Sequence, residues 1–463
     1  MTIPAGTDVL IAGGGNAALC AAIEARSVGA DVVVLEHADP MMRGGNTRHT
    51  RNLRVMHDAP VATLTGAYTE HEFWEDLLQV THGHTDEALA RQMIRESEPL
   101  LEWLKTQGVH FQPALSGTLG LARTNAFFLG GGRTMLNALY QRAEALGVQV
   151  VYDTEVQTLD LHDGYFTGAQ VRHRDRNEKI EARAVVVASG GFQANTSWLR
   201  EAWGAAAEGF IVRGTPYNTG TLLRDLMKKG AATIGDSTQC HAIAVDARAP
   251  KFDGGIATRI DCICFSVVVN VNGQRFYDEG EDLWPRRYAT WGRLIAEQPQ
   301  QTACAIFDSK VRERFMPSVF PPEKADSIPE LAARIGIDAE SLSATINEFN
   351  AAVVDGNYDP DVLDTCTTRG LTPAKSHWAL RLDTPPFYAY RLRPGITFTY
   401  LGLQVDAQAR VLFDNGRTAP NIFAAGEIMA GNILRQGYCA GTGMTIGGVF
   451  GRIAGRGAAC IAK

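Results

Sequence analysis

The sequence predicts an α/β fold, in which a Rossmann-like dinucleotide-binding domain is interrupted by an inserted α+β capping domain. A strand, glycine turn, helix and strand follow one another between residues 8 and 36. Further apolar strands recur at 148–152, 184–189 and 420–425. One sheet therefore draws strands from both ends of the chain, which requires an insertion between them.

The length of the chain supports the same division. A chain of 463 residues exceeds the size that one hydrophobic core usually serves. The pattern is less regular in the middle of the chain, where it predicts a helix at 218–231 and β-type runs at 264–271 and 303–307. We expect three segments, which are the first part of the dinucleotide domain (1–233), the capping domain (234–371) and the second part of the dinucleotide domain (372–463).

The N-terminal unit has the residue types that a dinucleotide requires. Gly13 permits a sharp turn after the first strand, Gly15 lets a pyrophosphate approach the backbone, and Ala18 lets the helix pack closely on the sheet. The helix N-terminus offers free N–H groups and a positive dipole to phosphate. Glu36 ends the next strand at the spacing expected of a residue that accepts hydrogen bonds from ribose hydroxyls.

Segments far along the chain favour FAD over NAD. Gly426 and Glu427 follow the late strand, and Gly441 to Gly443 precede a final helix of small apolar residues. The N-terminus of that helix can place a positive dipole at the flavin. The expected FAD contacts are Gly13, Gly15, Asn16, Ala17, Glu36, Gly44, Gly45, Asn46, Thr47, Val156, Gly190, Gly191, Gly426, Glu427, Gly443 and Thr445.

Six motifs resemble the fumarate reductase and succinate dehydrogenase flavoprotein superfamily over nearly the whole chain. They are the Gly13 fingerprint, RGGNT at 43–47, GGGR at 130–133, VVVASGGF at 185–192, GQRFYDE at 273–279, and AAGE with GTGMTIGGVFGRIAG near the end. Within that superfamily, GGGNAALCAA, RGGNTRHTRNLRVMHDAP and RTNAFFLGGG are similar to the FAD-dependent tricarballylate dehydrogenases.

The resemblance implies a reaction and a cofactor. Tricarballylate would be oxidised to cis-aconitate by hydride transfer to flavin N5, and a separate protein would accept the electrons. Some relatives attach flavin covalently through a histidine, but the residues around His49 match that pattern poorly, so we expect non-covalent FAD. The alternatives are a fumarate reductase-like or 3-ketosteroid dehydrogenase-like flavoenzyme, or a flavin electron-transfer subunit without a substrate site.

The resemblance also implies a set of substrate residues. Arg287, with Arg286 as the alternative, falls at the position of the arginine that transfers a proton, and Thr258 and His241 fall at substrate-binding positions. Arginine normally stays protonated, so Arg287 could instead clamp a carboxylate, with His241 as the more conventional base. The sequence leaves both roles open.

Two departures from the fumarate reductase pattern affect this set. Arg259 and Cys262 stand where that family has proton-relay residues, which weakens the case for the reductive direction. Near the C-terminus, Tyr438 stands where that family has a substrate-binding arginine, and Arg435 lies three residues earlier. We expect Arg435 and Tyr438 to bind the substrate, whose third carboxylate would account for a rearranged clamp.

Composition limits the remaining possibilities. The net charge of −7 and the lack of a Lys/Arg block argue against a nucleic-acid surface. The eight cysteines have no metal-ligand spacing, so we expect no metal and mostly buried, reduced thiols. There is no basic leader and no apolar run of membrane-spanning length, which predicts a cytoplasmic protein that reaches a membrane only through its electron-accepting partner.

Overall fold

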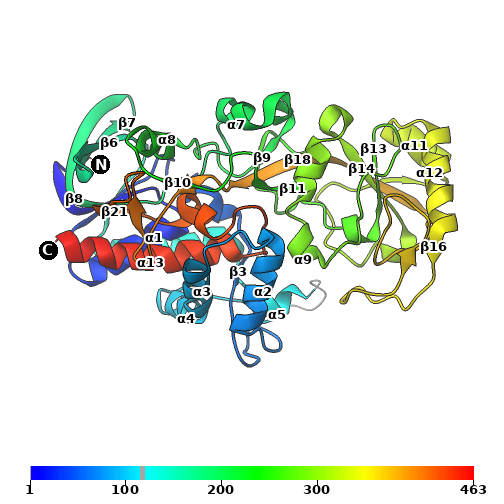
Figure 1. Cartoon of the computed structure of the whole chain (residues 1–463), viewed down its shortest axis with the longest axis horizontal. Coiled ribbons are helices and arrows are strands. Elements are labelled where there is room, and N and C mark those ends of the chain that lie inside the picture. Colours follow the sequence, from blue (N-terminus) through cyan, green and yellow to red (C-terminus); the bar gives the residue numbers. More distant parts are fainter. Residues whose placement is uncertain (1, 115–119, 463) are drawn as a thin grey trace.

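The computed structural model describes residues 2–114 and 120–462, and its two main sheets lie side by side (Figure 1). The first sheet has eight strands, with β20, β21, β8, β1, β2 and β5 in spatial order and with β6 and β7 attached to β8. Pairing is parallel from β21 to β5, as the βαβ pattern predicts. The strands are β1 (Gly6–Ala12), β2 (Val32–Leu35), β5 (Gln149–Val151), β6 (Thr154–His162), β7 (Tyr165–His173), β8 (Arg176–Val187), β20 (Arg410–Leu412) and β21 (Thr418–Ala424).

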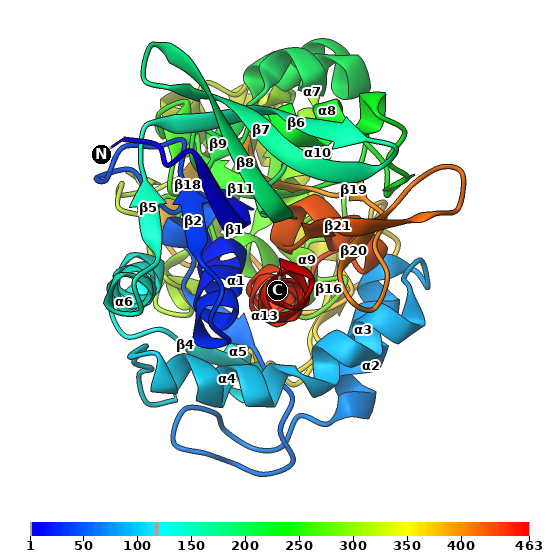
Figure 2. The same cartoon turned by 90° about the vertical axis from the view of Figure 1, so that its left-hand side faces the viewer.

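The two helices that flank the dinucleotide fingerprint are α1 (Asn16–Ser27) and α13 (Thr442–Ala462), which lie next to each other beside the first sheet (Figure 2). Glycines allow this close approach. A Cβ atom at Gly451 would lie 2.5 Å from the carbonyl oxygen of Ala17, and one at Gly455 would lie 2.2 Å from that of Ala21. The end of the chain is thereby packed against its beginning, and the predicted α/β fold is confirmed.

The second sheet has seven strands, arranged around the long strand β18 (Phe387–Thr399). Its other strands are β9 (Ile211–Arg213), β11 (Cys240–Asp246), β12 (Phe252–Asp253), β13 (Val267–Asn270), β14 (Ala303–Asp308) and β15 (Glu323–Ala325). Helices α11 (Ile328–Ile335) and α12 (Ala339–Ala352) pack on it through a separate apolar core. The strands of this sheet extend beyond both limits of the predicted capping domain, residues 234 and 371. Strand β9 lies before residue 234, and strand β18 lies after residue 371.

The remaining helices surround these sheets. They are α2 (Glu70–Thr81), α3 (Glu87–Arg95), α4 (Ser97–Thr106), α5 (Leu121–Thr124), α6 (Gly131–Ala145), α7 (Thr196–Trp203), α8 (Thr221–Lys228), α9 (Trp284–Arg287) and α10 (Trp291–Ala296). Three short strand pairs complete the fold, formed by β3 (Asn52–Arg54) with β4 (Asn125–Phe127), β10 (Thr233–Ile234) with β19 (Gly402–Leu403), and β16 (Val353–Val354) with β17 (Thr367–Thr368).

The cysteines are unbridged, and all are buried except Cys460. None of the described helices is both long enough and apolar enough to cross a bilayer.

Candidate active site

A large cavity is lined by residues from both sheets. It extends from the glycine turn after β1 to a cluster of basic and aromatic side chains at the second sheet. All of the predicted FAD contacts line it except Gly191 and Thr445. Gly191 packs behind the lining, where a Cβ atom would lie 2.1 Å from Thr399 Oγ1, and the Thr445 hydroxyl donates a hydrogen bond to the carbonyl of Arg54.

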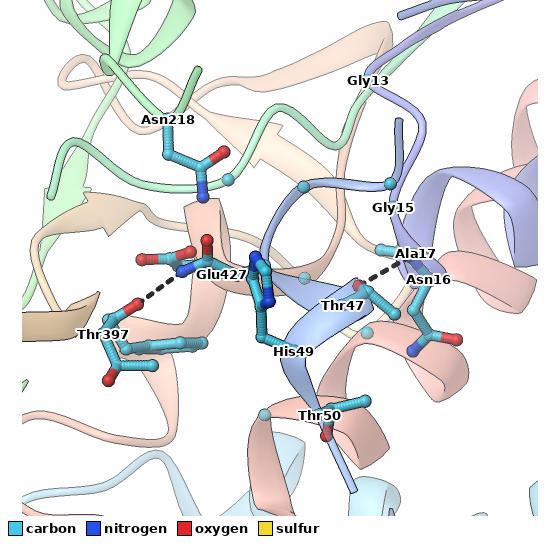
Figure 3. Close-up of a pocket in the computed structure, with 18 of the residues that line it drawn as sticks. Gly13, Gly15, Asn16, Ala17, Thr47, His49, Thr50, Asn218, Thr397 and Glu427 are labelled. Carbon is cyan, nitrogen blue, oxygen red and sulfur yellow. Dashed lines mark hydrogen bonds between the residues drawn. The ribbon is translucent and has the colours of Figure 1, made fainter. Parts of the chain in front are cut away.

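The glycine turn forms a cradle at one end of the cavity (Figure 3). Gly13 has a φ of +116°, and a Cβ atom there would lie 2.4 Å from the carbonyl oxygen of Ala188. Glu36 accepts hydrogen bonds from the backbone N–H groups of Ala38 and Gly44, at 3.0 and 3.1 Å. Burial raises the pKa of Glu36. The carboxylate therefore fixes the loop that follows β2 as well as closing the cradle.

The RGGNT segment joins the two sheets across the cavity. The Asn16 backbone N–H donates to Thr47 Oγ1 at 3.0 Å, which holds the segment at the start of α1. Asn46 reaches the other way, donating to the carbonyl of Thr397 at 2.7 Å and accepting from the backbone N–H of Thr215 at 2.9 Å. Both residues thus set the width of the cavity.

Glu427 lines the cavity between the glycine turn and the cluster of basic and aromatic side chains at the second sheet. It accepts hydrogen bonds from the Thr399 backbone N–H at 2.9 Å and from Gln193 Nε2 at 3.2 Å. Burial raises the pKa of Glu427 to about 7, although these hydrogen bonds oppose the rise. Since β18 ends at Thr399, Glu427 connects the second sheet to the turn that precedes α13.

Three arginines converge at the far end of the cavity. Arg51, Arg213 and Arg259 all line it. Arg259 forms an ion pair of 2.6 Å with the buried carboxylate of Asp261. Crowding by Arg259, followed by burial, lowers the pKa of Arg51 to about 9, and burial, followed by Arg259, lowers that of Arg213 to about 10. These shifts mark a site where positive charge is concentrated and undercompensated.

His241 lies beside these arginines. Its ring stacks on Tyr438 with a centroid distance of 4.2 Å and an interplanar angle of 4°, and its edge meets Tyr288. Neither ring nitrogen has a hydrogen-bond partner among the described residues. Burial, together with Arg213 and Arg259, lowers the pKa of His241 well below its usual value. The imidazole is therefore neutral at neutral pH and has a free lone pair.

Three of the predicted substrate residues do not line the cavity, namely Arg287, Thr258 and Arg435. Arg287 is ion-paired with Glu281 and donates to the Tyr277 hydroxyl at 2.6 Å. The Thr258 hydroxyl donates to Asp253. The Nε of Arg435 is buried without a hydrogen-bond partner among the described residues.

The geometry of α9 explains the position of Arg287. Trp284 and Tyr288, four residues apart on one helical face, line the cavity. Arg286 and Arg287 lie on other faces of this single turn, and Arg286 pairs with Asp76 and Asp282. From this helical turn and the residue after it, Trp284, Pro285 and Tyr288 line the cavity, and Arg286 and Arg287 do not.

Sequence reasoning also missed several lining residues. Arg51 lies within the RGGNTRHTRNLRVMHDAP motif but has no assigned role there, Arg213 belongs to none of the motifs, and Arg259 is interpreted only as a departure from the fumarate reductase pattern. The available signal was their position, since Arg51 follows the RGGNT segment and Arg213 ends a short apolar run.

Comparison with known proteins identifies the family. The family described as "FAD binding domain" matches residues 8–446, so the chain belongs to it and its cofactor is FAD. The cradle fits this cofactor, because its glycines stand where side chains would collide with backbone or fill the cavity.

Relatives support the wider superfamily expected from the sequence. NADH:fumarate oxidoreductase of Klebsiella pneumoniae is 25% identical over 98% of this chain and 48% of its own length. NADH:acrylate oxidoreductase of Vibrio harveyi is 25% identical over 99% of this chain and 51% of its own length. The chain spans about half the length of these two relatives. Digoxin reductase of Eggerthella lenta is 26% identical over 98% of this chain and 87% of its own length.

Solved structures show the same fold. A flavocytochrome c3 fumarate reductase in an open conformation superposes with a TM-score of 0.76 at 22% identity, over 99% of this chain and 78% of the other. A 3-ketosteroid-Δ4-(5α)-dehydrogenase from Rhodococcus jostii gives a TM-score of 0.75 at 23% identity, over 99% of this chain and 98% of the other. Reductases and dehydrogenases thus share this architecture.

Substitution of Gly15 by valine should abolish FAD binding. A Cβ atom at Gly15 lies only 3.3 Å from Thr47 Oγ1 and 3.5 Å from the Gly44 carbonyl oxygen, so a larger side chain must extend into the pyrophosphate's approach. Flavin content is measured from the yellow colour that denaturation releases into the supernatant. Gly6→Val is the control, because Gly6 is exposed and its added Cβ meets one backbone atom at an ordinary 3.5 Å. Colour that stays with the precipitate would contradict non-covalent binding, and a fully yellow Gly15→Val protein would contradict the cradle.

Proposed function

We propose that the protein is an FAD-dependent oxidoreductase acting on a CH–CH bond of a small polycarboxylate, and that it oxidises tricarballylate to cis-aconitate. The observation that carries this proposal is the convergence of Arg51, Arg213 and Arg259 on one end of the cavity, where Asp261 pairs with Arg259 alone. Bound FAD supplies the hydride acceptor. Electrons then leave through a separate electron-accepting protein, which is also the route by which the chain would associate with a membrane.

The charge balance favours an anionic substrate. Burial opposes the ionisation of Asp261, yet Arg259 and Arg51 keep its pKa below the usual range. Its single negative charge is therefore present, and it already pairs with Arg259. Three guanidinium groups then exceed the negative charge around them. A substrate with two or three carboxylates supplies the missing charge and accepts bidentate hydrogen bonds in the geometry that guanidinium groups prefer.

The neighbouring groups supply acid–base chemistry. The neutral imidazole of His241 can accept the proton that leaves carbon as the hydride departs from the adjacent carbon. Tyr438 accepts a hydrogen bond from the Gly443 backbone N–H at 3.0 Å, so its own hydroxyl proton is available to a substrate carboxylate. The stack of Tyr438 on His241 fixes the orientation of the imidazole.

The alternatives differ in how they use this site. A fumarate reductase-like activity would use the same arginines in the opposite direction, and several relatives are named as reductases. A neutral steroid, the ligand class of one structural neighbour, would leave several buried cations without a partner. A subunit that only transfers electrons would need no such cluster. A polycarboxylate would pair with all three arginines. Arg259 and Cys262, which stand where fumarate reductases have proton-relay residues, favour its oxidation over the reverse reaction.

Rapid mixing of the oxidised holoprotein with di- and tricarboxylates under anaerobic conditions tests this function. Tricarballylate should bleach the flavin. Arg259→Lys should raise the apparent dissociation constant by roughly 10-fold to 100-fold, because a bidentate charged contact is lost. Arg287→Lys should change the dissociation constant and the rate by less than about 3-fold, since a lysine can keep the exposed pairing with Glu281. A large loss of rate in Arg287→Lys, with little change in Arg259→Lys, would instead support the proton-transfer role that the family resemblance implies for Arg287.

The pH dependence of the second-order rate constant of flavin reduction tests the role of His241. That constant reports groups of the free enzyme. The neutral imidazole is the proton acceptor, and its pKa is lowered, so activity should persist as the pH falls past about 6.5, where an ordinary histidine would be half protonated. Arg213→Gln removes one cation that lowers this pKa, and should therefore shift the acid limb to higher pH. If the acid limb lies at the ordinary histidine pKa and Arg213→Gln does not shift it, His241 is excluded as the base.

A further inference from the structure

Arg51 differs from the other two arginines in how its donors are used. It lies in the loop between the turn Gly45–His49 and β3. Among the described residues, the side chain has one hydrogen-bond acceptor, the thioether of Met316, at 3.3 Å from Nη1. A thioether is a weak acceptor, and Met316 itself is 54% exposed. Most of the guanidinium donors of Arg51 are therefore available to a ligand.

Arg213 and Arg259 are held more firmly by the protein. Arg213 donates to the carbonyl of Gly255 at 3.1 Å and to the Thr397 hydroxyl at 3.3 Å. Arg259 is bound to Asp261 and lies over the ring of Tyr288 at 5.1 Å. Both belong to the second sheet or its loops, whereas Arg51 approaches from the segment attached to the FAD cradle. The three cations thus divide into a fixed pair and a third with few partners.

We infer that Arg51 determines specificity for a third carboxylate, while Arg213 and Arg259 hold the two carboxylates that a succinate-like substrate would also present. This inference rests on the proposed function and deepens it. The crowding of Arg51 by Arg259 supports it, because an anion placed against Arg51 relieves that repulsion.

The same arrangement discriminates against dicarboxylates. A dicarboxylate bound by Arg213 and Arg259 leaves Arg51 partly desolvated and without an anionic partner, whereas a tricarboxylate pairs all three cations. Specificity then arises from an unpaired charge in the wrong complex as much as from an added contact in the correct one. Arg51 is accordingly a substrate-binding residue that decides between two classes of substrate.

The test compares two ligands that differ by one carboxymethyl group, tricarballylate and succinate. Under anaerobic conditions, the apparent dissociation constant of tricarballylate is taken from the concentration dependence of the flavin-reduction rate, and that of succinate from its competitive inhibition of that reduction. Arg51→Gln should weaken tricarballylate by roughly 100-fold and change succinate by less than about 3-fold. Arg51→Lys, which keeps the charge but loses the bidentate fork, should fall between Arg51→Gln and the wild type for tricarballylate.

Arg48→Gln is the matched control, because Arg48 lies three residues away, bonds to Met41 and Met42, and does not line the cavity. It should leave both affinities unchanged. Flavin content and melting temperature of each variant show whether it is folded. Equal weakening of both ligands by Arg51→Gln, or no weakening of either, would overturn the role of Arg51 alone. A wild-type flavin spectrum that responds to neither ligand would overturn the proposed function as well.

Discussion

Backbone pairing along β18 holds the cofactor cradle and the arginine cluster at a fixed separation. The register of β18 with β11 sets His241 opposite Phe398, and its register with β9 sets Ile396 opposite Val212, next to Arg213. The strand then ends at Thr399, whose N–H binds Glu427 beside α13. Since these contacts are between backbone groups or a buried carboxylate, small side-chain changes elsewhere should leave the geometry of the site intact.

The arginine cluster is costly for the fold and useful for function. Burying cations without full compensation is unfavourable, and Asp261 offsets only part of that charge. Crowding by Arg259, followed by burial, lowers the pKa of Arg51, and burial, followed by Arg213 and Arg259, lowers that of His241. A polyanionic ligand reverses the balance, because it is attracted by charges that the protein already holds in place. Binding energy and acid–base chemistry therefore originate from one electrostatic arrangement.

The FAD cradle could be predicted from sequence, whereas the substrate end could be predicted only in part. The cradle depends on a short strand, turn and helix in which each glycine has a local reason, and almost every residue expected there lines the cavity. Arg213 is positioned by β9, which pairs with a strand that begins 174 positions after Arg213, and no local pattern encodes that pairing. Arg287 follows Trp284 and Pro285 closely in sequence, but one residue along a helix rotates a side chain by about 100°, and Arg287 does not line the cavity.

The most direct measurement is a crystal structure of the reduced holoprotein, whose flavin cannot accept a hydride, with tricarballylate bound. We expect its three carboxylates to contact Arg51, Arg213 and Arg259, with His241 against the carbon atoms that separate them. Carboxylates bound instead by Arg287 or Arg435, with the three cavity arginines left free, would contradict this expectation.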